Sequence, residues 1–315
     1  MARKVTIEQL YKKMDLEIIA GSNGLNNAIT DDEILVPGVE FAGFIRFFSS
    51  TKLTLISSRE ATYLSELGED VAKARVEEIF KLKPSVFLFS RNVIIPQYFI
   101  DFGNQYDVPI LRSNLRTATL YSKIYGYLRD QLAPRQSVHG VLMDINGMGT
   151  LIIGKSAIGK SETALELVKR GHQLVADDRV EIYEKEVGTL IGSSPATIAQ
   201  YIEVRGVGIV NVVHMFGAGA YRETKKIRLV IELEAWDKNK VYDRLGTGEL
   251  TETYFHTNLP KIVIPILPGR NNAVLVEAAA MNSKLKYLGL DGSKELIERI
   301  GRITRGEQLW FWIRF

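Results

Sequence analysis

Hydrophobic and polar positions follow two patterns along the first 132 residues. Apolar residues spaced three and four apart predict helices at residues 6–14, 70–81, 96–105 and 117–132. Short apolar runs between these segments predict strands at residues 52–56, 85–89 and 109–111. Strands that alternate with helices are typical of parallel sheets, and we therefore expect residues 1–132 to form an N-terminal α/β domain.

The pattern changes after residue 132. Residues 133–137 include Pro134 and have the composition of a linker, so we place the domain boundary near residue 133. Two apolar strands at 138–145 and 150–153 are separated by four residues with two glycines, which predicts a β-hairpin. Further strands are expected at 173–176, 198–202, 227–233, 261–264 and 273–276, with a late helix at 294–303. This pattern therefore predicts that residues 133–315 form a second α/β domain.

Composition places the chain among ordinary globular proteins. Its 315 residues are ample for two cores, and 46% are hydrophobic against 24% charged. We find no apolar stretch near the roughly eighteen residues that a membrane span needs, and no signal-peptide core, so we expect no membrane partner. The sequence has no cysteine, which excludes disulfides and favours the cytoplasm. The net charge of +3, from 40 basic and 37 acidic residues, is too small to indicate that the protein binds nucleic acid.

A phosphate-binding motif follows the predicted hairpin. It fits the P-loop pattern G-x-x-x-x-G-K-[ST], between an apolar strand and a helix-forming segment, and its residues are Gly154, Lys155, Ser156, Ala157, Ile158, Gly159, Lys160 and Ser161. Glycines let backbone N–H groups close around phosphate oxygens, and the positive end of the helix dipole points at the same place. Lys160 would neutralise the outer phosphates, and Ser161 would ligate Mg²⁺. The motif predicts binding of a nucleoside triphosphate or another polyphosphate.

Two adjacent carboxylates, Asp177 and Asp178, follow the predicted strand at 173–176. One can hold Mg²⁺ directly or through water, and the other can accept the proton of an attacking hydroxyl. Adjacent side chains on extended backbone point to opposite sides, so we expect only one of them to face the terminal phosphate. A solvated acidic turn paired with Arg179 is the alternative interpretation.

A second group of functional side chains lies in one segment after a predicted strand, and it contains Glu203, Arg205, Gly206, Gly208 and Asn211. Glu203 is a candidate second metal ligand and Arg205 a candidate phosphate contact, because Ser161 alone cannot fix a cation. A salt bridge between the glutamate and the arginine is the structural alternative. The two glycines resemble the start of a dinucleotide fingerprint, but asparagine stands where the third glycine belongs, and we reject that interpretation.

Three more side chains are candidates for chemistry. His139, at the start of the predicted hairpin, can tune an aspartate or relay its proton, whereas a lone histidine is more often structural. Arg244 and Arg270 follow loop signals, where a planar guanidinium can reach a transferring phosphate. Taken individually, each arginine also fits a surface position.

Together these segments closely resemble the bacterial bifunctional HPr kinase/phosphorylase family. The resemblance rests on the sequence from His139, the P-loop and its helix, Val-Ala-Asp-Asp at 175–178, Glu-x-Arg-Gly-x-Gly at 203–208 and Pro-Gly-Arg-Asn at 268–271. The block at 203–208 is the most specific of these. The first half of the chain is similar mainly in length and in the neighbourhoods of Pro37 and Arg59.

The resemblance implies a bifunctional enzyme. Members phosphorylate a serine of HPr, the small phosphocarrier of the sugar phosphotransferase system, with ATP or pyrophosphate and Mg²⁺. They also catalyse the reverse phosphorolysis, in which inorganic phosphate attacks seryl phosphate and yields pyrophosphate, and thereby regulate carbon metabolism. Their catalytic domain is related to phosphoenolpyruvate carboxykinase, and C-terminal helices in the hexamer help a neighbouring subunit to hold HPr. We therefore expect residues 133–315 to be the catalytic domain of a cytoplasmic homohexamer.

Matching positions carry the family's roles onto this chain. Lys160 would bind the phosphates. Ser161 and Glu203 would hold Mg²⁺, and Arg244 would stabilise charge on the transferred group. Asp178 is implied as general base in phosphorylation and general acid in the reverse reaction, with Asp177 beside it and His139 assisting. The sequence leaves open which aspartate takes the proton.

The resemblance also assigns two segments to particular directions of the reaction. Residues 202–211 would serve both directions, and the loop from Pro265 to Arg270 mainly the reverse one. In that loop the family commonly has Pro-Val-Arg-Pro-Gly-Arg, whereas this chain has Leu267 in place of the first arginine. Loss of that guanidinium predicts weaker phosphate binding and slower phosphorolysis.

Two other functions fit part of the pattern. A small-molecule or carboxykinase-like kinase accounts for the P-loop and the paired aspartates but not for the block at 203–211. A GTP-binding switch needs a guanine-reading Asn-Lys-x-Asp, and Tyr242 stands where its aspartate belongs. Use of pyrophosphate as donor would favour the HPr kinase, and guanine selectivity would favour the switch.

Overall fold

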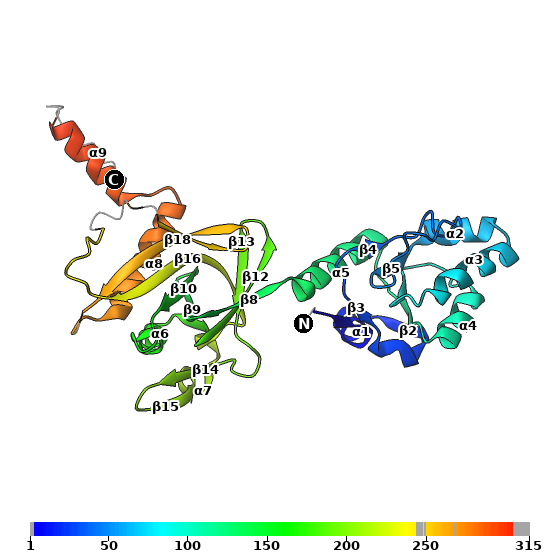
Figure 1. Ribbon diagram of the computed structural model, residues 1–315, viewed down its shortest axis with the longest axis horizontal. Helices are drawn as coiled ribbons and strands as arrows, with labels where there is room; N and C mark the ends of the chain where they lie inside the picture. Colours follow the sequence, from blue (N-terminus) through cyan, green and yellow to red (C-terminus); the bar gives the residue numbers. More distant parts are fainter. Residues whose placement is uncertain (1–2, 244–247, 249, 268, 305–315) are drawn as a thin grey trace. The chain divides into compact units, whose positions relative to one another are not determined.

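The computed structural model describes residues 3–243, 248, 250–267 and 269–304. The chain divides into two compact units, Met1–Pro134 and Arg135–Phe315 (Figure 1). Both units combine helices and strands, so the prediction of a mixed α/β protein with N-terminal and C-terminal parts is confirmed. Among the helices that can be described, none is long and apolar enough to cross a membrane.

The first unit is built on a largely parallel sheet. Within residues 3–134 its strand order is β2-β7-β6-β5-β4, with the bounds Glu17–Ala20 (β2), Ile110–Arg112 (β7), Phe87–Phe89 (β6), Leu53–Ile56 (β5) and Ile34–Leu35 (β4). Strands β4 to β7 are parallel neighbours, and β2 is antiparallel to β7. A separate antiparallel pair joins β1 (Val5–Thr6) to β3 (Ala28–Ile29). The predicted parallel arrangement is therefore present in this unit.

Helices cover both faces of this sheet, and their bounds are Ile7–Met14 (α1), Ser58–Glu66 (α2), Glu69–Lys81 (α3), Gln97–Tyr106 (α4) and Thr117–Leu132 (α5). Alternate residues of a strand point to opposite faces. Phe87 and Phe89 of β6 therefore pack with α3 and α4 in one buried cluster, whereas Leu88 packs with α1 and α5 in another. The helices predicted at 6–14, 70–81, 96–105 and 117–132 are all confirmed.

The second unit is built on a mixed sheet. In its described part the order is β11-β9-β10-β16-β13-β12-β8, β18 also pairs with β16, and β17 pairs with β18. The bounds are Arg135–His139 (β8), Val141–Ile145 (β9), Met148–Gly154 (β10), Gln173–Ala176 (β11), Arg179–Glu186 (β12), Thr189–Ser193 (β13), Thr224–Ala235 (β16), Leu250–Tyr254 (β17) and Thr257–Ile266 (β18). A separate hairpin joins β14 (Tyr201–Val204) to β15 (Gly208–Asn211). The predicted hairpin leading to the P-loop is confirmed as β9-β10.

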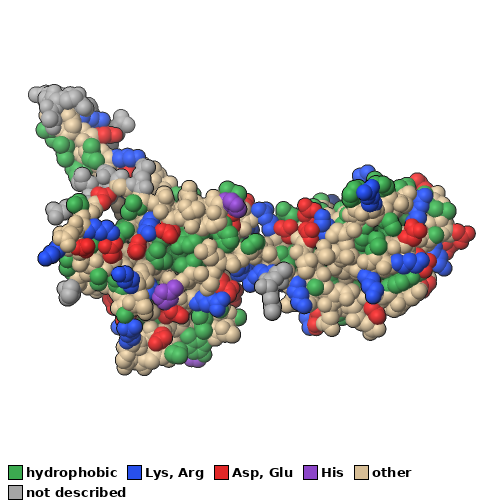
Figure 2. Space-filling view, viewed as in Figure 1, with side chains coloured by type: hydrophobic (Ala, Val, Ile, Leu, Met, Phe, Trp, Pro, Cys, Tyr) green, Lys and Arg blue, Asp and Glu red, His purple; other side chains and the backbone are tan. Residues whose placement is uncertain are grey.

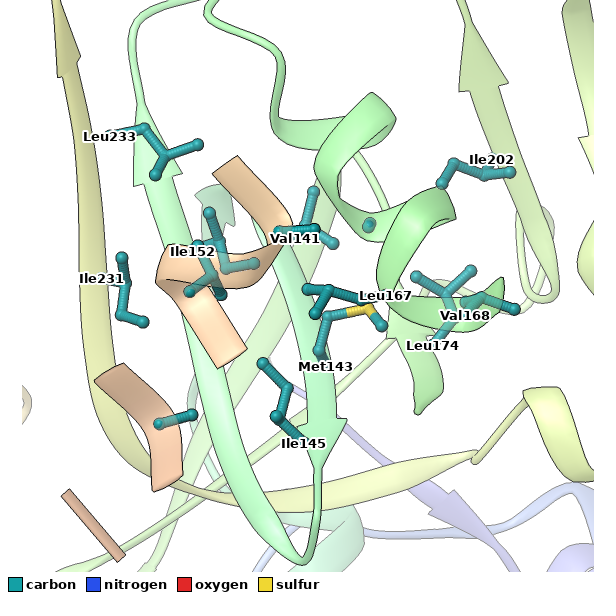
Figure 3. Packing of buried hydrophobic residues seen from close by; sticks show 14 of the residues in the cluster. Val141, Met143, Ile145, Ile152, Leu167, Val168, Leu174, Ile202, Ile231 and Leu233 are labelled. Carbon is teal, nitrogen blue, oxygen red and sulfur yellow. The ribbon is translucent and has the colours of Figure 1, made fainter. Parts of the chain in front are cut away.

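Both faces of the second sheet are buried. Helices α6 (Lys160–Lys169) and α8 (Asn272–Tyr287) pack on one face, and α7 (Val212–Phe216) contributes Val212 to the same cluster. Figure 3 shows Met143 of β9 and Ile152 of β10 in this cluster, with Met143 beside Leu167 of α6. Leu142, which alternates with Met143 along β9, lies in the cluster on the opposite face. Packing of α6 on β9 and β10 therefore fixes the helix whose first residue is Lys160.

The single strand predicted at 138–145 is wrong. The segment forms two strands, β8 and β9, which are interrupted at Gly140. A Cβ atom at Gly140 would lie 2.6 Å from the Ile152 carbonyl oxygen, so the chain bends at a close backbone approach. Because β8 pairs with β12 while β9 pairs with β10, the two halves occupy different places in the sheet. Strand β8 begins at Arg135, so most of the linker predicted at 133–137 is strand.

The strand predicted at 273–276 is also wrong, because these residues lie in α8. The side chain of Asn271 caps this helix by accepting hydrogen bonds from the backbone N–H groups of Ala273 and Val274. A run of four apolar residues does not by itself distinguish a buried strand from a buried helix. The strand predicted at 198–202 is displaced, since β14 spans Tyr201–Val204, and the late helix is confirmed as α9 (Gly292–Thr304).

Candidate active site

The P-loop connects β10 to α6 through backbone conformations that favour glycine. Gly154 has φ 145° and Gly159 has φ 95°, and Ala157 between them has φ 69°. A Cβ atom at Gly154 would lie 2.4 Å from the carbonyl oxygen of Leu233, so no larger residue fits there without movement. Alternation between right- and left-handed backbone turns successive N–H groups toward one point, which is the geometry of an anion-binding nest. The loop therefore has the shape that phosphate binding requires.

Lys160, the first residue of α6, is held against its own loop. Its Nζ donates hydrogen bonds to the carbonyl oxygens of Gly154, 3.0 Å away, and Lys155, 3.1 Å away. Nζ also lies 3.1 Å from Nε2 of His139. Burial lowers the pKa of Lys160, and the nearby carboxylates of Asp177 and Asp178 act in the opposite direction. The buried ammonium thus lies between the backbone of its own loop and the imidazole of His139.

Asp177 is buried between the P-loop helix and the β14-β15 hairpin. Its Oδ1 accepts a hydrogen bond from the Ser161 hydroxyl at 2.8 Å, and its Oδ2 accepts one from the backbone N–H of Glu203 at 3.1 Å. Asp177 has only 4% of its surface exposed, and this burial raises its pKa. The two hydrogen bonds to the carboxylate act in the opposite direction. Asp177 therefore ties three segments of the site together.

Asp178 lies beside Asp177 but has a different environment. Its side chain is 70% exposed, and Oδ1 lies 3.1 Å from Nδ1 of His139. The backbone oxygen of Asp178 is also 3.0 Å from the same ring nitrogen. Because Nε2 faces the Lys160 ammonium, which has only hydrogens to donate, the ring proton belongs on Nδ1, where it is donated to Asp178. Lys160, His139 and Asp178 thus form one hydrogen-bonded chain.

The expectation that the two aspartates point to opposite sides is wrong. It assumed extended backbone, whereas Asp178 has φ 62°, which is left-handed. Both carboxylates consequently line one cavity of about 200 Å³, whose walls are His139, Ser156, Ala157, Gly159, Lys160, Ser161, Glu162, Asp177, Asp178, Glu203 and Arg205. Figure 2 shows charged side chains and a histidine on this unit, over the region where Figure 1 places α6 and β9.

The β14-β15 hairpin supplies the remaining wall of the cavity. Glu203 is the third residue of its first strand, and Arg205 begins its turn. The structure describes no ion pair between these two exposed side chains. Gly206 and Gly208 have φ 81° and 103°, which the tight turn requires. Asn211 does not line the cavity; its side chain caps α7 by accepting hydrogen bonds from the backbone N–H groups of Val213 and His214.

Other predicted site residues lie apart from this cavity or outside the described part of the chain. Arg244 and Pro268 belong to the residues whose structure is not described. Pro265 is in β18, and Arg270 is exposed, with its backbone N–H donated to the Leu267 carbonyl oxygen at 3.3 Å. Glu162 lines the cavity and was not among the predicted residues. Its place directly after Ser161 in the first turn of α6 was the available signal.

The oxygen atoms around Ser161 are those that Mg²⁺ prefers. The Ser161 hydroxyl bonds the Asp177 carboxylate, which also accepts from the backbone N–H of Glu203, and all three residues line the cavity. Among residues 3–304 that the structure describes, no three His, Cys, Asp or Glu side chains are grouped so as to hold a metal by themselves. Mg²⁺ commonly keeps waters and binds through one or two protein oxygens plus substrate phosphates, so this sparse set fits it.

Comparisons with known proteins cover nearly the whole chain. Residues 5–128 match the family profile described as HPr Serine kinase N terminus, and residues 130–300 match HPr Serine kinase C-terminal domain. The HPr kinase/phosphorylase of Bacillus licheniformis is 44% identical over 307 residues, which are 97% of this chain and 99% of the relative. This chain belongs to the HPr kinase/phosphorylase family.

Other members of the HPr kinase/phosphorylase family are similarly close. The HPr kinase/phosphorylase of Bacillus subtilis strain 168 is 42% identical over 306 residues, again 97% of this chain and 99% of the relative. The solved HPr(Ser) kinase/phosphatase from Coxiella burnetii is 40% identical, covers 51% of this chain and 98% of its own, and gives a TM-score of 0.47. The family profile over 130–300 includes every residue that lines the cavity. A kinase family implies a nucleotide-using enzyme.

Proposed function

We propose that this protein transfers the terminal phosphoryl group of ATP, or a phosphoryl group of pyrophosphate, to a serine of HPr. In the reverse direction, inorganic phosphate attacks the seryl phosphate and yields pyrophosphate and free HPr. The observation that carries the proposal is the hydrogen-bonded chain from Lys160 through His139 to Asp178, which places an exposed carboxylate beside a phosphate nest. Both directions use the same cavity.

In this proposal the P-loop N–H groups and Lys160 hold the donor phosphates. The Ser161 hydroxyl and Glu203 would hold Mg²⁺, with Asp177 behind them as the acceptor that orients the serine. The cation neutralises charge on the phosphates when it is bound. Arg244, Arg205 and Arg270 remain predicted phosphate contacts, and Gly206 and Gly208 shape the turn that presents Arg205.

We assign the proton transfer to Asp178 rather than to Asp177. Asp177 already accepts hydrogen bonds on both oxygens and is buried, whereas most of the Asp178 carboxylate is exposed to an approaching hydroxyl. Asp178 would take the proton of the HPr serine in phosphorylation and return it when phosphate attacks. Microscopic reversibility requires one group to act in both roles. His139 keeps the carboxylate in place by donating from Nδ1.

The proposal includes HPr as partner, a homohexameric assembly and a location in the cytoplasm. Helix α9 supports an assembly, because its apolar side chains Leu296, Ile297, Ile300 and Ile303 are each about half exposed. The cytoplasm is supported by the absence of cysteine from the sequence.

The direct test is transfer of labelled γ-phosphate from ATP·Mg²⁺ to purified HPr. We expect label on a serine of HPr, and we expect Lys160→Ala to abolish the transfer. Lys169→Ala, at the exposed end of the same helix, is the matched control and should keep the parent rate. Release of label only as inorganic phosphate, with none on HPr, would reject the proposal.

A further inference from the structure

Two aromatic rings stack at the end of strand β16. The ring centroids of Trp236 and Tyr242 are 5.0 Å apart, and the ring planes are inclined by 21°. Trp236 nevertheless keeps 47% of its surface exposed. Because Tyr242 covers one face of the indole, a further flat ring can stack only on the opposite face. Neither ring lines the cavity that contains the aspartates.

The position of this pair relative to the P-loop follows from the strand register. Gly154, which starts the P-loop, is the parallel partner of Leu233 in β16, and Trp236 lies three residues beyond Leu233, roughly 10 Å along the strand direction. The aspartates follow β11, which lies on the other side of β10, beyond β9. The aromatic pair and the aspartates therefore lie on opposite sides of the P-loop, at the same edge of the sheet.

This arrangement determines how a nucleoside triphosphate would be oriented on the P-loop. Its terminal phosphate must face Asp178 to reach the acceptor hydroxyl, and its phosphates must lie across the nest between Gly154 and Ser161. The nucleoside then emerges from the nest on the side away from β11. That side is formed by the ends of β16 and β18, which are parallel neighbours up to the pair Ala235 and Ile266.

Hydrogen bonds hold the Tyr242 ring and the backbone of Trp236 in place. The Tyr242 hydroxyl accepts from the backbone N–H of Asp237 at 3.0 Å and donates to Oε1 of Glu234 at 3.3 Å. Lys240 Nζ donates to the other oxygen of Glu234 at 2.6 Å. The backbone N–H of Trp236 donates to the Ile266 carbonyl oxygen at 3.2 Å. A ring that is already fixed loses little conformational entropy when a flat ligand stacks on it.

We propose that the exposed face of Trp236, backed by Tyr242, stacks on the base of the donor nucleotide. This inference rests on the proposed function, since it requires that the P-loop holds a nucleoside triphosphate. Stacking uses the π-face of a base and does not read its edges, so the platform adds affinity without selecting among purines. A donor without a base, such as pyrophosphate, makes no use of it. The platform thus separates the two proposed donors by affinity.

The test is calorimetric binding of ATP and of inorganic tripolyphosphate, both with Mg²⁺, to the full-length protein. Tripolyphosphate carries the same number of phosphates without a nucleoside. We expect Trp236→Leu to weaken ATP binding about tenfold, which is the size typical of base stacking on an aromatic ring. The affinity for tripolyphosphate should stay within about twofold of the parent value. Trp236→Phe keeps an aromatic face and should retain most of the ATP affinity. Val241 lies in the same loop and is 96% exposed, so Val241→Ala should change the affinity for neither ligand.

Equal weakening of both ligands by Trp236→Leu would overturn the inference, because it would show that Trp236 only supports the loop. Unchanged ATP affinity would also overturn it, because the base would then lie elsewhere. The experiment contains no HPr, so its outcome is separate from that of the proposed function. Tenfold weakening of ATP alone, in a protein that transfers no phosphate to HPr, would support the platform and reject the proposed acceptor.

Discussion

Nδ1 of His139 makes two contacts with Asp178, at 3.1 Å to the carboxylate Oδ1 and at 3.0 Å to the backbone oxygen. The same imidazole faces the Lys160 ammonium through Nε2. One ring therefore links the proposed base to the phosphate-binding lysine and fixes its own tautomer by doing so. Its position depends on the interruption at Gly140, which separates β8 from β9 and leaves His139 at the edge of the cavity.

Replacement of the proposed base should reduce turnover far more than binding. We expect Asp178→Asn to lower kcat for HPr phosphorylation by about 10²–10⁴-fold, the usual contribution of a positioned acid or base. The KM for ATP should change little, because the role proposed for Asp178 is toward the acceptor and not toward the phosphates of ATP. Steady-state kinetics in both directions would check this, with Asp70→Asn in α3 as an exposed control. A loss confined to one direction would contradict a shared acid and base.

Removal of the imidazole should misplace the carboxylate and the lysine together. We expect His139→Ala to lower kcat by about tenfold to a hundredfold, less than Asp178→Asn, since the imidazole orients the base and does not replace it. His139→Asn can still donate one hydrogen bond and should recover part of the loss. Kinetics of the double variant provide the check. Additive losses in His139→Ala with Asp178→Asn would show that the two residues act independently.

The burial of Asp177 should make the stability of the nucleotide-free protein depend on pH. Burial raises the pKa of this carboxyl above its ordinary value of 3.8, so the folded chain binds more protons than the unfolded chain between the two values. The free energy of unfolding should therefore fall as pH rises through that window. Asp177→Asn removes the titrating group and should flatten this slope. Urea unfolding at several pH values would decide, and an identical slope in the variant would reject the assignment.

Two glycines offer a matched pair of substitutions. A Cβ atom at Gly154 would lie 2.4 Å from the Leu233 carbonyl oxygen, so Gly154→Ala should destabilise the second unit by about 1–3 kcal/mol and abolish nucleotide binding. Gly126 lies in the middle of α5 with no atom within 4 Å of an added Cβ, so Gly126→Ala should stabilise the first unit by about 0.5–1 kcal/mol. Thermal unfolding of both variants tests the pair. Equal destabilisation would show that backbone proximity is not the cause.

Local features of this chain were predictable from sequence, and features set by distant pairing were not. The P-loop and α5 depend on residues close in sequence, so pattern alone located them. The break at Gly140 depends on β12, which pairs with β8 from some forty residues further along the chain. Likewise α8 is a helix because Asn271 caps it and the sheet packs on it, and its apolar run alone did not reveal this.

The same distinction applies to the site. The chemistry of Lys160 and Ser161 follows from the motif and is visible in sequence. The shared cavity of the two aspartates depends on the left-handed backbone of Asp178, which neighbouring sequence did not reveal. Asn211 was assigned to the site, but its side chain caps α7. The kinship with phosphoenolpyruvate carboxykinase stays a prediction.

Leu267 provides a test of the reverse reaction. The loop after β18 has Leu267 at the position where the resemblance to the family predicts an arginine, and a guanidinium there would add a bidentate phosphate contact. We expect Leu267→Arg to speed phosphorolysis at low phosphate by about threefold to tenfold and to leave the kinase direction nearly unchanged. Leu267→Gln is a control for polarity without charge. An arginine variant that gains nothing would reject the proposed role of this position.

The most direct measurement uses seryl-phosphorylated HPr and labelled inorganic phosphate. We expect the full-length protein to remove the phosphoryl group from HPr and to place the label in pyrophosphate, because phosphate attacks the seryl phosphate in the cavity of Asp178. Dephosphorylation of HPr with the label left entirely in inorganic phosphate would mean hydrolysis by water, and it would contradict a shared site for kinase and phosphorylase reactions.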